Sequence, residues 1–352
     1  MPLLSVLDQS PIKSGGTAVA AVRETLELAR IADRLGYHRD WLAEHHATAG
    51  LASSSPEILI GQVAGCTRGI RVGSGGVMLS HYSPLKVAES FRMLETLFPG
   101  RIDLGIGRAP GTDQRTARIL AHEPGDGDAD RFPEKVGHLL GFLGNSFDPG
   151  HPYRGVRVMP DGPGSPEVWL LGSSDQSAIL AAQYGTAFAF AHFINSDGCA
   201  EVVRYYRQTF RPSPLLDAPR AGLAVFVISA DSEAEARRLA RSRDLFVARL
   251  YTGRAGQYPS VEEAEAHVYS DHERAIVSGA RRRSIVGTPE QVRDRLLELG
   301  GQAGADEFVV LTITHDFAAR VRSYELLAKA FDLTPRTPPS AEECPRSRPE
   351  RG

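Results

Sequence analysis

The stretch IRVGSGGVMLSHYSPLKVAESFRMLETLFPGRIDLGIG, residues 70–107, alternates between strand-like and helix-like patterns. Residues 70–79 are mostly apolar or small, which predicts a buried strand. Ser83-Pro84 then opens a helix that closes at Pro99-Gly100, and residues 101–107 return to a strand pattern. A strand, a helix and a second strand in this order predict a β-α-β unit with parallel strands.

The same alternation extends over most of the chain. Eight such units predict an α/β fold, a closed (β/α)₈ TIM barrel with loop insertions at its C-terminal face, in one domain over residues 1–333. An open doubly wound sheet is the alternative. The predicted strands cover residues 3–8, 39–44, 70–79, 101–107, 168–172, 187–194, 221–228 and 307–313.

Four other segments lack a clear period. Residues 112–130 are rich in Gly and Asp and predict an excursion over the active-site face or partial disorder, and residues 148–165 predict an irregular insert. Residues 253–283 are polar and poorly periodic. The tail at 334–352 is rich in Pro, Arg and Glu, which is typical of a disordered segment.

Composition excludes several classes of protein. The chain has 352 residues, a formal net charge of −3 and 24% charged residues, so it lacks the basic bias of a protein that binds nucleic acid or a membrane surface. Its three cysteines are far apart, which argues against a disulfide framework. The N-terminal sequence shows no signal-peptide or transmembrane pattern, and we therefore expect a cytoplasmic protein.

The second predicted strand ends in Trp-Leu-Ala-Glu-His-His, with His45 and His46 adjacent. Neighbouring residues of a strand point to opposite faces, so the two imidazoles are not expected to share a metal, and no metal-ligand spacing is present. One of them, if it faces the barrel mouth, can act as an acid or base near neutral pH. The alternative is a hydrogen-bonded structural pair.

Two further strand ends carry glycine-rich motifs. Gly75 and Gly76 have no side chain, which allows a planar ligand to lie against the backbone, although tight barrel packing is an equal explanation. Arg108 follows the fourth strand between glycines, where its planar guanidinium suits a phosphate.

A second phosphate contact is predicted at the end of the fifth strand, which runs directly into a helix through Ser173, Ser174 and Ser177. The free amides of the helix and the serine hydroxyls can donate to an anion, whereas simple capping by Ser173 or Ser174 is the alternative. Because no dinucleotide or P-loop motif is present, the predicted ligand has one phosphate, as FMN does.

At these strand ends the chain resembles the bacterial-luciferase-like flavin-dependent monooxygenases. The resemblance extends to four further stretches, which are ASSSPE at 52–57, the stretch at 71–89, GRIDLGIGRAPG at 100–111 and VGTPEQV at 286–292. The resemblance covers about residues 3–331. It implies reduced FMN delivered by a separate NAD(P)H:flavin reductase, and O₂ that reacts at the flavin C4a to give a hydroperoxide. It implies hydroxylation or epoxidation of a small organic substrate, in pathways that include secondary metabolism, and it favours a homodimer.

The resemblance also implies roles for individual residues. His45 matches the active-site histidine, and Arg108, Ser174 and Ser177 match the phosphate-binding residues. Gly75-Gly76 falls where the family has a non-prolyl cis peptide beside the flavin ring, and 253–283 matches a mobile loop over the site. We therefore expect 253–283 and 112–130 to act as lids that exclude water.

Two positions depart from the luciferase pattern, because Gly107 replaces a reactive cysteine and Ser173 replaces a glutamate. Light emission is therefore not predicted. The rival functions are a deazaflavin-dependent oxidoreductase, which needs further cationic groups for its long anionic tail, and a non-catalytic flavin-binding protein. A metal hydrolase lacks an obvious ligand set in the sequence.

Overall fold

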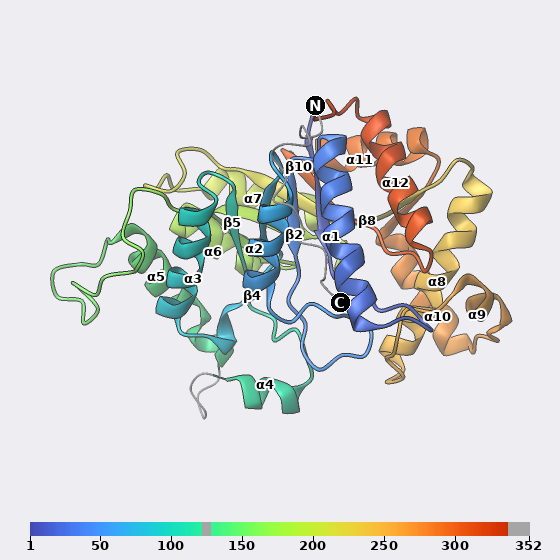
Figure 1. The fold of residues 1–352 in the computed structure, drawn as a ribbon, viewed down its shortest axis with the longest axis horizontal. Coiled ribbons are helices and arrows are strands. Elements are labelled where there is room, and N and C mark those ends of the chain that lie inside the picture. Colours follow the sequence, from blue (N-terminus) through green and yellow to red (C-terminus); the bar gives the residue numbers. More distant parts are fainter. Residues whose placement is uncertain (122–127, 337–352) are drawn as a thin grey trace, which may run out of the picture.

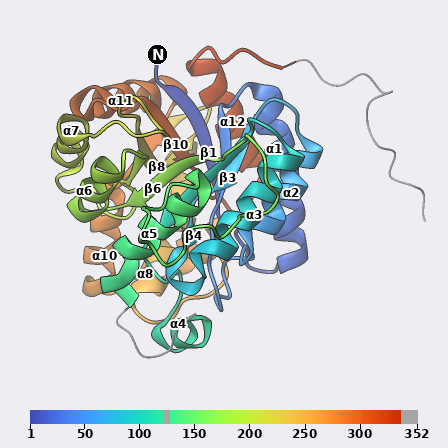
Figure 2. The same cartoon turned by 90° about the vertical axis from the view of Figure 1, so that its left-hand side faces the viewer.

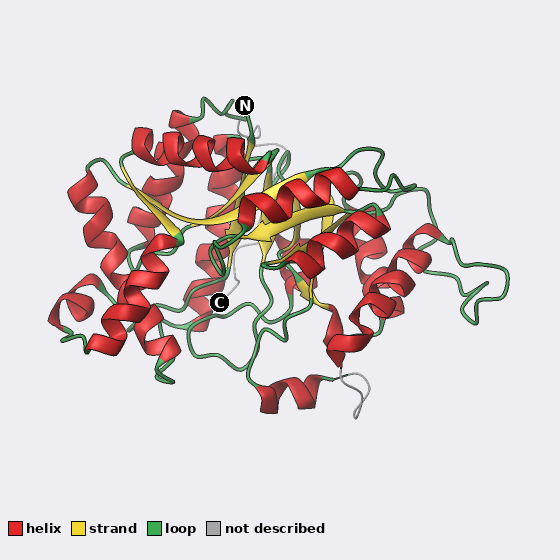
Figure 3. Ribbon diagram, turned by 180° about the vertical axis from the view of Figure 1, so that it is seen from behind, coloured by secondary structure: helices red, strands yellow, loops and turns green. Residues whose placement is uncertain are grey.

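The structure, a computed structural model, describes residues 1–121 and 128–336. Within these residues, eight parallel strands close into a barrel surrounded by helices (Figures 1 and 3). Around the barrel they are β1 (Leu3–Asp8), β2 (Arg39–Leu42), β3 (Arg71–Ser74), β5 (Ile102–Gly107), β6 (Glu167–Gly172), β7 (Ala187–Ala191), β8 (Ala221–Ser229) and β10 (Glu307–Leu311). Because β10 pairs with both β1 and β8, the sheet has no open edge here, and the predicted TIM barrel is confirmed.

The predicted helices are also confirmed, with ends that differ by a few residues. Thr17 caps the first helix through a bond from Ala20 N (3.1 Å), and Gly36 ends it in the left-handed region. Ser55 starts the second without a side-chain cap bond. These helices are α1 (Ala18–Leu35), α2 (Pro56–Cys66), α3 (Pro84–Leu97), α5 (Asp128–Gly144), α6 (Asp175–Tyr184), α7 (Cys199–Thr209), α8 (Glu233–Tyr251), α11 (Pro289–Ala303) and α12 (Phe317–Ala330).

One prediction about secondary structure was wrong, and two segments contain helices that the sequence did not predict. The strand predicted at 70–79 divides into β3 and a short β4 (Val77–Met78), followed by the 3₁₀ turn η1 (Leu79–His81). The segment 112–130 contains α4 (Gln114–Leu120), which lies at the end of the barrel opposite the N-terminus (Figures 1 and 2); residues 122–127 fall outside the described residues. The segment at 148–165 is irregular, as predicted.

The segment 253–283, for which no helix or strand was predicted, folds into α9 (Val261–Ala266) and α10 (Asp271–Arg282) and leads into β9 (Ser284–Gly287). Both helices start with a capping box, in which a serine and the glutamate three residues later bond to each other's backbone N–H. Such local bonds stabilise short helices that have little apolar periodicity.

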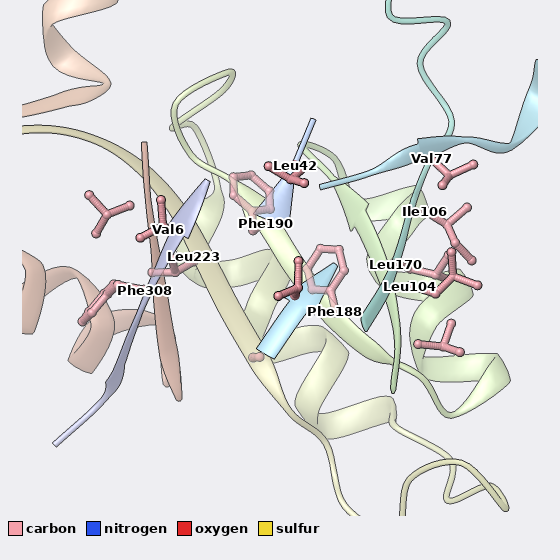
Figure 4. Packing of buried hydrophobic residues seen from close by; sticks show 14 of the residues in the cluster. Val6, Leu42, Val77, Leu104, Ile106, Leu170, Phe188, Phe190, Leu223 and Phe308 are labelled. Carbon is pink, nitrogen blue, oxygen red and sulfur yellow. The ribbon is translucent and has the colours of Figure 1, made fainter. Parts of the chain in front are cut away.

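The core has an outer and an inner part. Side chains on the outward face of the strands, such as Val6, Leu170 and Phe188, pack with the surrounding helices (Figure 4). Alternate residues, including Trp41 and Trp169, form a second cluster inside the barrel, as the two-residue period of a strand requires.

The inside of the barrel near the start of the strands is closed by buried charges. Arg39 has no exposed surface and pairs with Asp103 (2.7 Å), Glu307 (2.7 Å) and Glu167 (3.2 Å). Its guanidinium also lies 4.8 Å from the ring centroid of Trp169. Since this end of the barrel is filled, space for a ligand has to be found at the other end.

The first residues of the tail that was predicted to be disordered are held against the barrel. Arg336 donates from its backbone N to Arg34 O (2.9 Å) and from Nη1 to Asp33 O (2.9 Å), so residues 334–336 lie against the end of α1. Asp33 also accepts bonds from the backbone N–H groups of residues 68–70. The rest of the tail, 337–352, lies outside the described residues. No described helix is long and apolar enough to cross a membrane.

Candidate active site

A cavity of about 760 Å³ lies at the carboxyl ends of the strands, where TIM barrels have their active sites. We call it the mouth cavity. Its walls come from the loops after β1, β2, β5, β7 and β10, from β8 and from α8 and its following turn. The lining residues are Gln9, His45, His46, Ala47, Thr48, Ala49, Leu51, Gly111, Thr112, Asp113, Phe193, Ile194, Phe226, Arg243, Phe246, Val247, Leu250, Tyr251, Ala255, Tyr258, Arg283, Leu311 and Ile313.

His45 lies in this wall with a ring nitrogen that has no partner. Its backbone N donates to Ser53 O (2.8 Å), which fixes the chain after β2. Its Nδ1 is buried and makes no hydrogen bond to the described residues. Burial, and to a smaller extent the neighbouring His46, lower the pKa of His45 to about 4. The imidazole is therefore neutral at pH 7, where it can accept or donate a hydrogen bond but carries no charge.

The expectation that His45 and His46 point to opposite sides was wrong, because both line the mouth cavity. The reason is that β2 ends at Leu42, so strand alternation does not extend to these residues. Unlike the ring of His45, the ring of His46 is fixed by a hydrogen bond, since its Nε2 lies 2.7 Å from Glu44 Oε1.

Glu44 is a functional candidate that the sequence analysis missed. Its carboxylate is fully buried and accepts bonds from Met78 N (2.9 Å) and Tyr82 Oη (2.8 Å) in addition to the contact with His46. It therefore ties the end of β2 to β4 and η1 and orients the His46 ring. The signal in the sequence was a glutamate directly before two histidines at a strand end.

Gly75 and Gly76 are joined by a cis peptide bond, as the resemblance implied. A Cβ on Gly75 would lie 2.7 Å from Leu7 Cδ1, and one on Gly76 would lie 2.8 Å from Gly105 O. Backbone packing thus requires glycine at position 76, whereas at position 75 the Leu7 side chain would have to move, and neither residue lines the mouth cavity. Contact between these glycines and a flavin ring stays a prediction.

Two of the predicted phosphate residues share a depression near the ends of β5 and β6, whereas Ser173 and Ser174 do not line it. Arg108 and Ser177 line this depression of about 470 Å³, and Arg108 donates to the side chain of Gln176. Ser174 is the N-cap residue of α6, but its hydroxyl makes no cap bond, so the capping alternative does not account for it. The side chain of Ser173 is not engaged either, although its carbonyl accepts from Asn195 Nδ2 (3.2 Å).

The expected lids also reach the mouth cavity. From the segment 253–283, Ala255 and Tyr258 line it, and Tyr258 Oη donates to Ile313 O (3.0 Å). From the other segment, Thr112 lines it and donates to His46 O (2.9 Å). Both segments therefore form part of the cavity wall, and the first is fastened to the barrel by a buried tyrosine. Within the described residues, no cluster of three or more His, Cys, Asp or Glu has the arrangement of a metal site.

A TIM barrel with an apolar cavity at its C-terminal mouth and a candidate phosphate site nearby suits a phosphorylated small-molecule ligand. Residues 3–307 match the family model of the luciferase-like monooxygenases, and the chain belongs to that family.

Three relatives illustrate the range of this similarity. The chain is 42% identical to a luciferase-like monooxygenase of Escherichia coli strain K12, over 92% of this chain and 95% of the relative. It is 39% identical to the N-acetyl-S-alkylcysteine monooxygenase of Bacillus subtilis, over 93% and 97%. The crystal structure of apo-MsnO8 is similar at 42% identity and a TM-score of 0.86, covering 95% of this chain and 99% of the other.

Proposed function

We propose that this chain is an FMN-dependent monooxygenase, which takes reduced FMN from a separate NAD(P)H:flavin reductase and uses O₂ to oxygenate a small organic substrate. The observation that carries the proposal is the pairing of a one-phosphate cradle with a largely apolar cavity at the same end of the barrel. We assign His45 to the reaction, and assign the flavin to Gly75, Gly76, Arg108, Ser173, Ser174 and Ser177.

The cradle fits a monophosphate. Among the described residues, the guanidinium of Arg108 bonds to the Gln176 side chain alone, which a phosphate can displace, and its planar fork matches two phosphate oxygens. Ser177 lies in the same depression, and the hydroxyl of Ser174 is free to donate. The start of α6 adds the positive end of a helix dipole, although Gln176 N already donates to Asp175 Oδ1 (2.8 Å).

Bound reduced FMN supplies the electrons that let O₂ transfer one atom to a substrate. The chain itself binds and orients the flavin and the substrate and keeps water away from them. The mouth cavity has apolar walls such as Phe226 and Leu311, and Ala255 and Thr112 cover it from the two lid segments. The neutral ring of His45, with its unpartnered Nδ1, can hold or move one proton at the substrate. We further expect a homodimer in the cytoplasm.

The test uses rapid mixing of the protein, loaded with reduced FMN without air, against oxygenated buffer. Oxidised FMN is expected to reappear more slowly than in free solution, and Arg108→Ala is expected to abolish this delay at the same FMN concentration. N-acetyl-S-alkylcysteines, named for the Bacillus subtilis relative, are the first trial substrates. With a substrate that turns over, His45→Ala is expected to slow oxygenation and to leave FMN binding unchanged.

The rival is a deazaflavin-dependent oxidoreductase, which one observation favours: Arg243 and Arg283, two cations outside the cradle, line the mouth cavity. Reoxidation of FMN at the rate of the free flavin, together with binding and hydride reduction of a deazaflavin, would overturn the monooxygenase proposal.

A further inference from the structure

Two arginines face the mouth cavity from outside the barrel. Arg243 lies on α8 and is only 7% exposed, with its guanidinium 4.2 Å from the ring centroid of Phe226. Arg283 lies in the turn between α10 and β9, and its Nε is buried. Both side chains line the cavity that holds His45. A buried guanidinium in an apolar wall is unusual unless a counter-ion accompanies it.

Neither arginine has a carboxylate partner among residues 1–121 and 128–336. Asp244 follows Arg243 in the sequence, but its Oδ2 accepts two bonds from Arg281 (2.6 and 3.0 Å). Arg243 donates only from Nη1, to Ala280 O (3.1 Å). Arg283 donates only from Nη1, to Ile194 O (2.6 Å), and its Nε has no partner.

The one carboxylate in the described cavity wall forms no ion pair with Arg243 or Arg283. Asp113 caps α4, where its Oδ1 accepts from Arg115 N (2.8 Å) and Thr116 N (3.0 Å) and its Oδ2 accepts from Thr116 Oγ1 (3.0 Å). The described part of the cavity thus has two cations and no free anion.

The two charges also act on each other. Burial lowers the pKa of Arg243, the nearby Tyr258 and Asp244 oppose this, and Arg283 lowers it further. Like charges that repel in a low-dielectric cavity are stabilised when an anion binds between them. A purely structural role explains part of the arrangement, because Arg243 reaches a carbonyl in the last turn of α10 and stacks on Phe226. It leaves the other N–H groups of Arg243 and the second arginine without a reason.

We propose that the mouth cavity binds the carboxylate of its substrate between Arg243 and Arg283, with the apolar body of that substrate against walls such as Phe246 and Leu250. A carboxylate matches the planar fork of a guanidinium and can engage both arginines through its two oxygens. The aromatic and aliphatic walls beside the arginines lower the local dielectric constant, which strengthens the ion pair. This inference rests on the proposed function and names the class of substrate: apolar carboxylic acids.

The test measures binding by calorimetry to the protein without flavin. The probes are octanoate and phenylacetate, each compared with its uncharged amide. At least one acid is expected to bind about tenfold or more tightly than its amide, because hydrogen bonds between charged groups are stronger than those to a neutral amide. Arg243→Met and Arg283→Met are each expected to remove this preference, whereas Arg322→Met, an exposed arginine paired with Asp231, is expected to keep it.

Equal binding of acid and amide to the unaltered chain would overturn the proposal, as would an unchanged preference in both cavity variants. Because Arg283 is less buried than Arg243, its variant keeps the test valid if Arg243→Met fails to fold, which circular dichroism reports. A second arm compares FMN with riboflavin. If the arginines instead bind the flavin phosphate, Arg283→Met loses the preference for FMN and Arg108→Ala keeps it, which also overturns the proposal.

The two proposals fail in different ways. Carboxylate binding is measured without flavin, so a protein that proves to use a deazaflavin can still select the acid over its amide. Conversely, a protein that delays FMN reoxidation but does not distinguish acid from amide retains the proposed cofactor and loses this substrate class.

Discussion

Replacing His45 by glutamine is expected to make the protein more resistant to acid. The unfolded chain binds a proton at this ring below about pH 6.5, the ordinary histidine value, whereas in the folded protein the pKa is about 4. The proton therefore favours the unfolded state between these two values. Folding stability is full above about pH 6.5 and falls as the pH is lowered toward 4.

The magnitude follows from the two pKa values. Between pH 7.5 and pH 5, one histidine with these values costs the folded state about 2 kcal/mol, and the full loss below pH 4 is about 3 kcal/mol. His38, whose pKa is also lowered to about 4, by burial and then by Arg39, contributes a loss of the same sign, reduced by its greater exposure to solvent. His45→Gln should therefore remove the part of the acid sensitivity that comes from His45 and leave the part that comes from His38.

The assay is urea unfolding at pH 7.5 and pH 5, with the slope of each transition checked for equality. The difference between the two unfolding free energies is expected to be about 2 kcal/mol smaller in His45→Gln than in the unaltered protein. His272→Gln, which removes an exposed ring on α10, is the control and should not reproduce this gain. An unchanged difference in His45→Gln would show that the ring is not in the desolvated environment described here.

Other substitutions test the cradle, the base of the barrel and its packing. Arg108→Ala is expected to weaken FMN binding about tenfold or more, measured by flavin fluorescence, with little change in Tm. The pKa of Glu167 is lowered to about 2, because Arg39 and other arginines outweigh the effect of its burial. The ionised carboxylate therefore stabilises the folded protein above about pH 4.3, and this stabilisation is lost as the pH falls toward 2. Glu167→Gln should make the unfolding free energy, measured with urea, depend less on pH in this range. Gly105→Ala should lower the unfolding free energy by about 1–3 kcal/mol, because the added Cβ would overlap the carbonyl of a β3 residue. Gly301→Ala on α11 is the control, and it should raise the unfolding free energy by about 0.5–1 kcal/mol because no atom lies near the added Cβ.

Most of the barrel was predictable because its signals are local. Each strand is a short apolar run, and helices start and stop at residues such as Thr17, Gly36 and Thr288 that can be identified by type. The errors arose where the controlling interaction is not apolar periodicity. The capping boxes that start α9 and α10 were present in the sequence as serine followed three residues later by glutamate, and the low periodicity of the segment obscured them.

The site was only partly predictable. His45 and Arg108 could be found because strand ends in a barrel meet at one face. Arg243 and Arg283 could not, since one lies mid-helix and the other in a turn, and in a sequence both look like ordinary surface charges. What distinguishes them is that Asp244 is engaged by Arg281, which depends on how α8 and α10 pack together.

The contact between Arg336 and the end of α1 bears on how the protein can be shortened or extended. Asp33 joins the chain after α2 to the residues after α12, so one carboxylate holds an N-terminal and a C-terminal segment together. Ending the chain at 333 would leave Asp33 without its arginine, although its bonds to residues 68–70 would remain. A purification tag or a fused reductase is therefore better attached beyond residue 336 than at the end of α12, because the contact between Asp33 and Arg336 then stays intact.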